Sequence, residues 1–109
     1  MATDTLNDPV LKRFRTALDD IYGSRLERVV LFGSRARGNA RTDSDYDIAI
    51  FLKSLPDSER WSELDRLAKL RVDFLDETGA FFDAKPYSSA AYEDRSPVMH
   101  DIRREGLDL

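Results

Sequence analysis

Two short clusters of polar residues, separated by a ten-residue spacer, could carry out chemistry together. Gly33 and Ser34 follow the apolar run 29–32, and Asp45 and Asp47 open a second apolar segment. Because side chains alternate along a strand, a strand here would turn its apolar residues to the core and both aspartates to the other face. Two carboxylates roughly 7 Å apart repel each other, and a divalent cation relieves that repulsion. Oxygen ligands of this kind suit magnesium or manganese.

The Gly33-Ser34 turn supplies a complementary anion site. It lies between a predicted buried strand and a short predicted helix. Backbone N–H groups and a hydroxyl at a helix N-terminus bind anions well. The two clusters together therefore predict a site for a metal-bound polyphosphate.

The string from Leu31 to Gly38, followed by Ser44-Asp45-Tyr46-Asp47, resembles a known family signature. It is similar to the minimal nucleotidyltransferase branch of the DNA polymerase β superfamily, whose signature is Gly-Ser, ten residues, then Asp-x-Asp. The resemblance implies a small α/β nucleotidyltransferase fold, with a mixed sheet of three to four strands flanked by helices. We expect one minimal domain over residues 1–109.

The resemblance also implies roles for individual residues. It assigns catalysis and metal binding to three acids, and nucleotide binding to four residues of the turn and spacer. The acids are Asp45, Asp47 and Asp83, and the nucleotide-binding residues are Gly33, Ser34, Arg35 and Ser44. The substrate would be ATP, bound with two Mg²⁺ ions or, as an alternative, Mn²⁺. An acceptor hydroxyl would attack the α phosphorus of ATP, and pyrophosphate would leave.

Several of these assignments have a structural alternative. Asp83 could instead form a salt bridge with Lys85 at a sheet edge, because its flanking residues do not closely match the family pattern. Ser44 could form a turn rather than contact the triphosphate. Three arginines of the spacer could bind phosphate or pair with the nearby aspartates at 43, 45 and 47; they are Arg35, Arg37 and Arg41.

Other polar and aromatic residues are weaker candidates. His100 is the only histidine and has no cysteine with which to form a transition-metal site. Asp73 competes with Asp83 for the role of third acid, but the local pattern makes it a surface helix residue. We expect Trp61 to lie in the core rather than to stack on a base.

Composition limits the possible classes of protein. The 109 residues are 41% hydrophobic and 35% charged, as in an ordinary soluble domain, and there is no cysteine. The apolar runs are short and the N-terminus lacks a signal pattern, so we expect a cytoplasmic protein without membrane contact. The net charge of −4 argues against direct binding of nucleic acid.

Periodicity and capping residues predict the order of elements. We expect a helix over 9–22, a strand near 28–32, a short helix after the Gly-Ser turn, and a strand over 45–52. A long helix should begin near Pro56 and end near Gly79. Its wide apolar face should include Trp61, Leu64, Ala68, Val72 and Leu75, flanked by Leu67 and Phe74. A strand over 80–87, with Pro86 at an edge, and a helix from Ser96 through Arg104 complete the chain.

The leading functional hypothesis follows from the resemblance and from the lack of a substrate-holding domain. Minimal members of this family typically pair with a small helical protein of the HEPN class, often a ribonuclease toxin. We therefore expect an antitoxin that transfers AMP from ATP to a tyrosine of its HEPN toxin. One alternative is an antitoxin or scaffold that acts by contact alone. Another is a nucleotidyltransferase subunit that modifies a small molecule or an RNA end.

Overall fold

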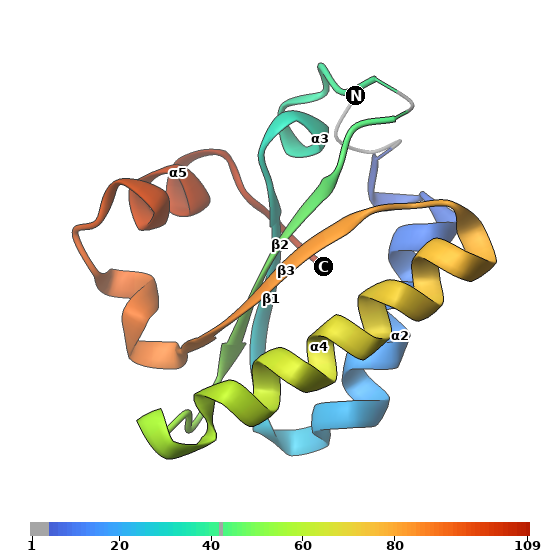
Figure 1. The fold of residues 1–109 in the computed structure, drawn as a ribbon. Helices are drawn as coiled ribbons and strands as arrows, with labels where there is room; N and C mark the ends of the chain where they lie inside the picture. The colour runs from blue at the N-terminus through green and yellow to red at the C-terminus, as the bar shows by residue number, and fades with distance from the viewer. Residues whose placement is uncertain (1–4, 42) are drawn as a thin grey trace.

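The structure, a computed structural model, describes residues 5–41 and 43–109. The predicted helices and strands are all present and in the predicted order, and two 3-10 helices and a short last strand are additional (Figure 1). They are α2 (Pro9–Tyr22), η1 (Gly23–Arg25), β1 (Leu26–Phe32), α3 (Ser34–Arg37), β2 (Tyr46–Leu52), α4 (Asp57–Thr78), β3 (Phe82–Ser88), η2 (Ser89–Glu93), α5 (Pro97–Glu105) and β4 (Leu107–Asp108).

The four strands form one mixed sheet in the order β3-β2-β1-β4. Strand β1 is antiparallel to both β2 and β4, whereas β2 and β3 are parallel. A parallel pair needs a long crossover connection, and α4 supplies it between β2 and β3. The predicted α/β fold with a mixed sheet of three to four strands is confirmed.

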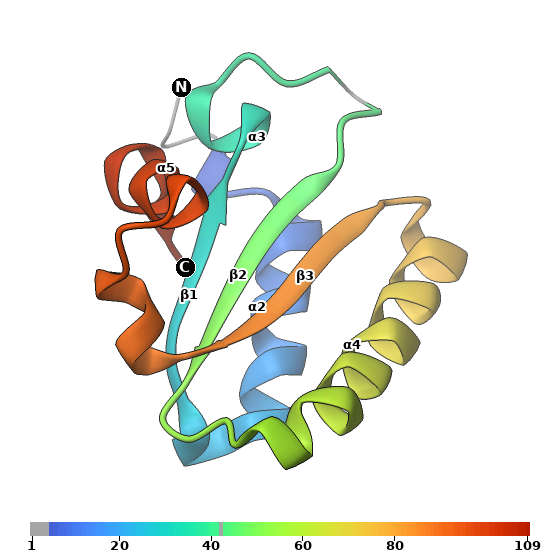
Figure 2. The same cartoon turned by 60° about the vertical axis from the view of Figure 1, so that its left-hand side comes forward.

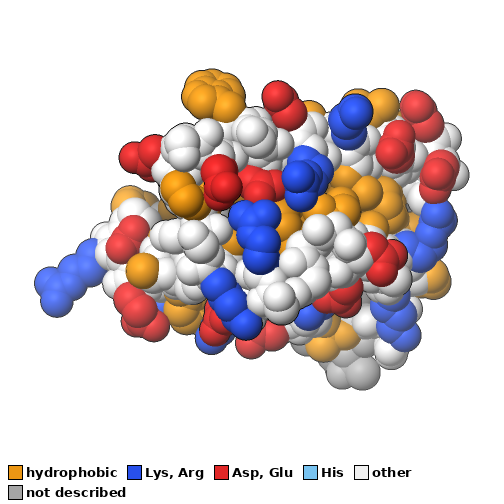
Figure 3. All heavy atoms as spheres, turned by 90° about the horizontal axis from the view of Figure 1, so that it is seen from below, with side chains coloured by type: hydrophobic (Ala, Val, Ile, Leu, Met, Phe, Trp, Pro, Cys, Tyr) orange, Lys and Arg blue, Asp and Glu red, His pale blue; other side chains and the backbone are white. Residues whose placement is uncertain are grey.

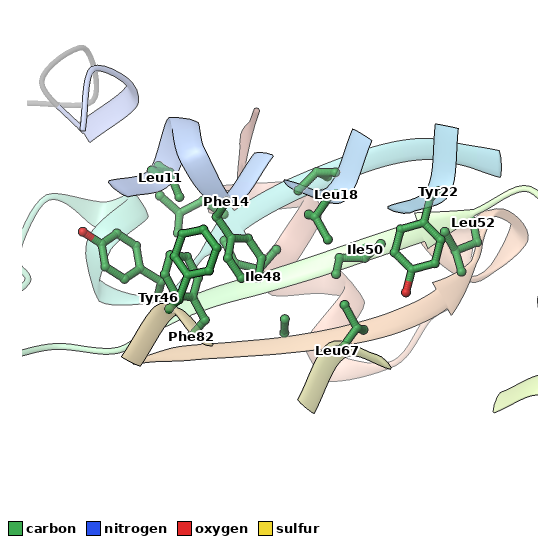
Figure 4. Packing of buried hydrophobic residues seen from close by; sticks show 14 of the residues in the cluster. Leu11, Phe14, Leu18, Tyr22, Tyr46, Ile48, Ile50, Leu52, Leu67 and Phe82 are labelled. Carbon is green, nitrogen blue, oxygen red and sulfur yellow. The ribbon is translucent and has the colours of Figure 1, made fainter. Parts of the chain in front are cut away.

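The main hydrophobic core lies between one face of the sheet and helices α2 and α4 (Figures 1 and 2). Phe14 of α2 stacks on Phe82 of β3, with ring centroids 3.9 Å apart, and meets Phe74 of α4 edge-on at 5.1 Å. Ile48 and Ile50 of β2 point into the same cluster (Figure 4). The even-numbered residues of β2 therefore fold the domain, as their alternation predicted.

The other face of the sheet carries a smaller core beneath α5 and η2. Ala49 and Phe51 of β2 contact Met99 and Ile102 of α5, and Tyr92 of η2 meets Phe51 edge-on at 5.4 Å. This cluster covers the odd-numbered face only along the second half of β2. Asp47 lies at the beginning of β2, outside this cluster.

Local capping explains where two of the helices begin. Asp8 accepts a hydrogen bond from the backbone N–H of Val10 at 2.9 Å and caps α2, with Pro9 in the first turn. Ser96 caps α5 in the same way by accepting from Met99 N–H at 3.3 Å. Both caps were readable in the sequence, and the predicted bounds of these helices are correct to within one residue.

The apolar face predicted for α4 is confirmed at its flanking residues, Leu67 and Phe74, and is wrong at its centre. Glu63, Leu67 and Phe74 are the buried side chains of this helix, whereas Trp61 is 76% exposed and Val72 is 56% exposed. Glu63 tolerates burial because Arg25 pairs with it at 2.8 Å. Arg25 lies outside α4 and far from it in the sequence. The expectation that Trp61 lies in the core is therefore wrong because a residue outside the helix allows the side that carries Glu63 to be buried.

The three predicted strands differ from the structure only at their ends, whereas the short strand β4 was not predicted. Strand β2 starts at Tyr46, one residue after Asp45, and β3 covers Phe82–Ser88 at the edge of the sheet. Pro86 lies within β3, where an edge position tolerates its missing N–H. Within the described ranges, none of the helices combines the length and the apolar character that crossing a membrane requires.

Candidate functional site

Asp47 of β2 and Asp83 of β3 are paired in register on neighbouring parallel strands. Adjacent strands lie about 4.8 Å apart, and side chains of paired residues point to the same face. Phe32 of β1 occupies the paired position on the other side of Asp47. The fold thus brings together two of the three acids predicted from the sequence, although they are 36 positions apart.

The Asp47 carboxylate packs directly against the backbone of Gly33. Its backbone has φ +75° and ψ −158°, a combination that residues with a Cβ rarely adopt. A Cβ added to Gly33 would lie 3.2 Å from the Asp47 carboxyl carbon and closer still to Oδ2. Both the backbone angles and the Asp47 side chain therefore require glycine at this position.

The electrostatics of the site raise the pKa of Asp47 above its ordinary value. Partial burial is the largest cause, followed by the negative charges of Asp83 and Asp45. Two cations, Lys85 and then Arg37, act in the opposite direction. The site thus holds concentrated negative charge that its own cations offset only in part.

Ser34 stands at the first position of the short helix α3, directly after Gly33. The turn closes through hydrogen bonds from the N–H groups of Ala36 and Arg37 to the Gly33 carbonyl, both 3.1 Å long. Since α3 follows β1 immediately, Ser34 lies at the same end of the sheet as Asp47, whose partner in β1 is Phe32. The predicted strand, Gly-Ser turn and short helix are confirmed.

Asp45 lies outside the sheet and is exposed, one residue before β2 begins. The expectation that Asp45 and Asp47 share one strand face is therefore not met, although Asp45 is near enough to raise the pKa of Asp47. Among residues 5–41 and 43–109, no three His, Cys, Asp or Glu side chains form a ready-made metal cluster. The site therefore consists of the Asp47–Asp83 pair, with Asp45 nearby but outside the sheet.

The donor set nevertheless fits a divalent cation that arrives with a nucleotide. Magnesium is usually held by one or two carboxylates together with substrate phosphates, not by a cage made of protein alone. Asp47 and Asp83 offer the two carboxylates, and their mutual repulsion is what a cation would relieve. The residues present are therefore compatible with a metal held jointly with a polyphosphate.

Arg35 is engaged with the protein itself. Its Nε donates to the Ser44 carbonyl at 2.9 Å, and its guanidinium carbon lies 3.9 Å from the centre of the Tyr46 ring. The Tyr46 hydroxyl donates to Asp8, the cap of α2. Burial, and next this hydrogen bond, raise the pKa of Tyr46 to about 12. These contacts tie the loop that carries Asp45 to the start of two helices.

The other spacer residues divide between structural roles and solvent. Arg37 pairs with Glu105 of α5 at 2.9 Å and not with any of the three nearby aspartates. Ser44 Oγ accepts from the backbone N–H of Arg41 at 2.8 Å and so takes part in a turn, while its contact with a nucleotide stays a prediction. Glu105 could not be recognised from the sequence, because its contact with Arg37 spans 68 positions.

A hollow of about 290 Å³ opens beside this loop. Arg35, Ser44, Tyr46 and Phe81 are among its lining residues, whereas Gly33, Ser34 and Asp47 are not. The four residues predicted to bind nucleotide therefore fall into two groups, one at the carboxylate pair and one at the hollow.

Lys85 is the one cation on β3 that shares a face with Asp83, and its Nζ lies 4.0 Å from Asp83 Oδ2. At this distance, with Lys85 exposed and Asp83 half-buried, the pair holds Asp83 only loosely. The alternation of Asp83 and Lys85 along the strand could have revealed this neighbour. Asp73 is an exposed helix residue, as predicted, and His100 is exposed on α5.

The family is shown by comparison with known sequences. The profile described as Polymerase beta, Nucleotidyltransferase matches residues 21–83, more than half of the chain. The matched region contains the Gly33-Ser34 turn, Asp45 and the Asp47–Asp83 pair. The chain belongs to this nucleotidyltransferase family.

Two relatives from Methanocaldococcus jannaschii (strain ATCC 43067) carry the name "putative protein adenylyltransferase". The first is 33% identical over 69 residues, which is 61% of this chain and 70% of the relative. The second is 42% identical over 43 residues, which is 39% of this chain and 43% of the relative.

Solved structures share the fold. A toxin-antitoxin complex with AMP-PNP matches with a TM-score of 0.59 and 18% identity, over 88% of this chain and 69% of the other. A tri-AMPylated HEPN toxin of Shewanella oneidensis in complex with its MNT antitoxin matches with a TM-score of 0.52 and 15% identity, over 91% of this chain and 70% of the other. At these identities the likeness establishes the nucleotidyltransferase fold.

Proposed function

We propose that this chain is an antitoxin that transfers AMP from ATP to a tyrosine of a HEPN ribonuclease toxin and thereby silences it. The observation that carries the proposal is the pair of carboxylates formed by Asp47 of β2 and Asp83 of β3, with Asp47 packed against Gly33, in a nucleotidyltransferase fold. Relatives named as protein adenylyltransferases, and a fold shared with an antitoxin bound to an AMPylated toxin, support the same direction.

Each predicted site residue has a proposed role. Asp45, Asp47 and Asp83 hold divalent cations, Mg²⁺ or Mn²⁺, together with the phosphates of ATP. Gly33 and Ser34 fix the triphosphate through the backbone and the hydroxyl at the start of α3. The bound cations would neutralise phosphate charge and favour ionisation of the acceptor hydroxyl. Arg35 and Ser44 shape the hollow beside the loop.

Transfer then requires one bond to form and one to break. The acceptor tyrosine oxygen forms a bond to the α phosphorus of ATP, and the bond from that phosphorus to the bridging oxygen of pyrophosphate breaks. Asp83 accepts the tyrosine proton, and pyrophosphate leaves with the electron pair of the broken bond. Asp83 suits this task because it is half-buried beside Asp47 and only loosely held by Lys85.

The acceptor comes from the partner in this proposal, and residues 1–109 act as one minimal domain. A second candidate function, neutralisation by contact alone, is favoured by the exposed Trp61 and by the absence of a three-ligand cluster within the described residues. The two functions differ in what Asp47→Asn does. Catalytic silencing is lost in this variant, whereas contact-based silencing survives.

The test uses the purified chain, magnesium and ATP labelled at the α phosphate, added to a lysate of the source cell. We expect one labelled protein band, absent with an Asp45→Asn, Asp47→Asn double variant. Asp73→Asn is the matched control, because it makes the same change at an exposed helix position. Labelling that persists in the double variant would contradict the assignment of the site, and lack of any labelled product would favour the contact-only alternative.

A further inference from the structure

Helix α4 carries a second apolar stripe that the domain does not use. This outer stripe consists of Trp61, Leu64, Ala68, Val72 and Leu75. Trp61 is 76% exposed, Val72 is 56% exposed and Ala68 is exposed, while Leu64 and Leu75 are half-buried. Figure 2 shows α4 on the outside of the domain beside the edge strand β3.

The fold gives no internal reason for this stripe. The helix docks on the sheet through Leu67 and Phe74, with Glu63 held by Arg25. A helix packed on one side of a domain normally carries polar residues on its free side. Here Ala68 and Val72, together with Lys69 and Asp73, line a shallow hollow on the surface. Contiguous exposed apolar residues of this kind mark an interaction surface.

The stripe is symmetric about Ala68. Trp61 and Leu75 lie seven residues before and after it, and Leu64 and Val72 lie four residues before and after it. In an antiparallel crossing of two copies of α4 at Ala68, residues equally far from the centre meet at the same level. Trp61 would then meet Leu75 of the second copy, and Leu64 would meet its Val72. The smallest side chain, Ala68, lies at the crossing point, where two helices approach most closely.

In the same antiparallel pair of α4 helices, charged residues beside the stripe of one copy would face residues of opposite charge in the other. Asp65 and Lys69 are exposed on one flank of the stripe, one turn apart. Neither takes part in an ion pair among the described residues. An antiparallel crossing at Ala68 places Asp65 of one copy about 3 Å along the axis from Lys69 of the other, which is within ion-pair reach. The two-fold symmetry makes this contact twice.

We propose that the outer stripe of α4 is a homodimer interface, in which two copies of this chain pack their α4 helices antiparallel across Ala68. Acidic, basic and hydrophobic side chains are interspersed on the side of the molecule where α4 begins (Figure 3). Such a mixed surface suits a protein partner rather than a polyanion. The Asp47–Asp83 pair lies on the sheet face opposite α4, so each dimer carries two open sites.

The first experiment is sedimentation of the purified chain from low micromolar to several hundred micromolar concentration. We expect the 12.5 kDa monomer to pass into a species of twice that mass. The emission of Trp61, the only tryptophan, should shift to shorter wavelength over the same range, because its exposed ring becomes buried. Ala68→Glu should raise the dimer dissociation constant by at least about tenfold by placing two carboxylates at the crossing point.

A charge exchange tests the antiparallel register. Asp65→Lys and Lys69→Asp should each weaken the dimer, and the double variant should restore it. Asp101→Lys is the matched control, since Asp101 is exposed on α5, which packs on the other face of the sheet from α4. It should leave dimerisation unchanged. All variants are at exposed positions, and retention of the thermal unfolding midpoint confirms that each is folded.

Three results would overturn the proposal: a monomer at every concentration, a dimer that Ala68→Glu leaves intact, or failure of the double variant to regain what each single variant loses. Capture of a different protein through the outer stripe, without self-association, would also overturn it. None of these readouts depends on AMP transfer, so the dimer proposal stands or falls separately from the proposed transfer reaction.

Discussion

Asp47 and Asp83 face each other across two parallel strands, and the Asp47 carboxylate rests against a glycine that leaves room for nothing larger. This arrangement is unfavourable for an isolated domain, because burial and neighbouring negative charge both raise the pKa of Asp47. Proteins commonly retain such repulsion at sites that bind a cation or substrate. The predictions below separate this electrostatic arrangement from ordinary structural roles.

Replacing Asp83 with asparagine should bring the pKa of Asp47 down toward its ordinary value. The change removes the second-largest cause of the upward shift, while partial burial and Asp45 remain. The pKa can be followed by NMR titration of the Asp47 carboxyl carbon. Asp73→Asn, on the outer side of α4, should not move it. An unchanged Asp47 titration in Asp83→Asn would show that the two carboxylates do not interact.

Replacing Asp47 with asparagine should stabilise the metal-free protein at neutral pH. Because the folded-state pKa of Asp47 lies above its unfolded value, the native state binds more protons, and stability falls as pH rises from about 3.8 through the raised pKa. The stability of the Asp47→Asn variant should not show this fall with rising pH, because asparagine does not ionise. Thermal unfolding of both proteins across acidic to neutral pH should therefore show midpoints that diverge as pH rises.

Magnesium or manganese together with ATP should reverse that order of stability. A ligand that binds only the native state stabilises it by about 2.7 kcal/mol at a concentration one hundred times its dissociation constant. The native protein should gain this stabilisation, and the Asp45→Asn, Asp47→Asn double variant should not. Equal gains in the two proteins, measured by thermal unfolding, would place the nucleotide and metal elsewhere.

Gly33→Ala should cost about 1–3 kcal/mol of unfolding free energy and abolish transfer. Gly79→Ala is a close control, because Gly79 has nearly the same φ, +74° against +75°, and open space around a new Cβ. It should cost only about 1 kcal/mol. The larger loss at Gly33 has two sources, the unusual ψ of Gly33 and the contact with Asp47. To separate them, the loss caused by Gly33→Ala should be measured again in a protein that carries Asp47→Ala. The loss should be smaller in that background only if the contact with Asp47 contributes to it.

The Arg25–Glu63 pair should stabilise the fold without any role at the site. Arg25→Ala leaves Glu63, which is only 4% exposed in its side chain, with the longer 3.7 Å contact to Arg66. We expect a loss of about 2 kcal/mol in chemical denaturation, reduced by the partial exposure of Arg25. Most of the loss should return when Glu63→Gln is added. A double variant as unstable as the single one would mean that packing, not the uncompensated charge, explains the effect.

Much of the fold was predictable because its signals are local. The Asp8 and Ser96 caps, the Gly33-Ser34 turn and the alternation of β2 each depend on residues near one another in the sequence. The Asp47–Asp83 pairing was predictable only through the family resemblance. Nothing in the two segments alone specifies their parallel register.

Helix α4 shows where sequence reasoning fails. Its outer stripe, with Trp61, is more apolar than the line of Glu63, Leu67 and Phe74 that is buried. The choice between them depends on Arg25, which compensates Glu63 from outside the helix. Similarly, Arg35 was predicted to bind nucleotide, but its stacking on Tyr46 could not be read from the sequence. Its role toward a nucleotide stays a prediction.

The central claim is tested most directly by the mass of the partner. The chain should be produced together with the HEPN toxin proposed as its partner, and the intact mass and modified residue of the purified toxin should be determined by mass spectrometry. We expect at least one adenylyl group on a toxin tyrosine, absent when the chain carries Asp47→Asn. An unmodified toxin that is nevertheless silenced, equally by the native chain and by Asp47→Asn, would contradict the catalytic account.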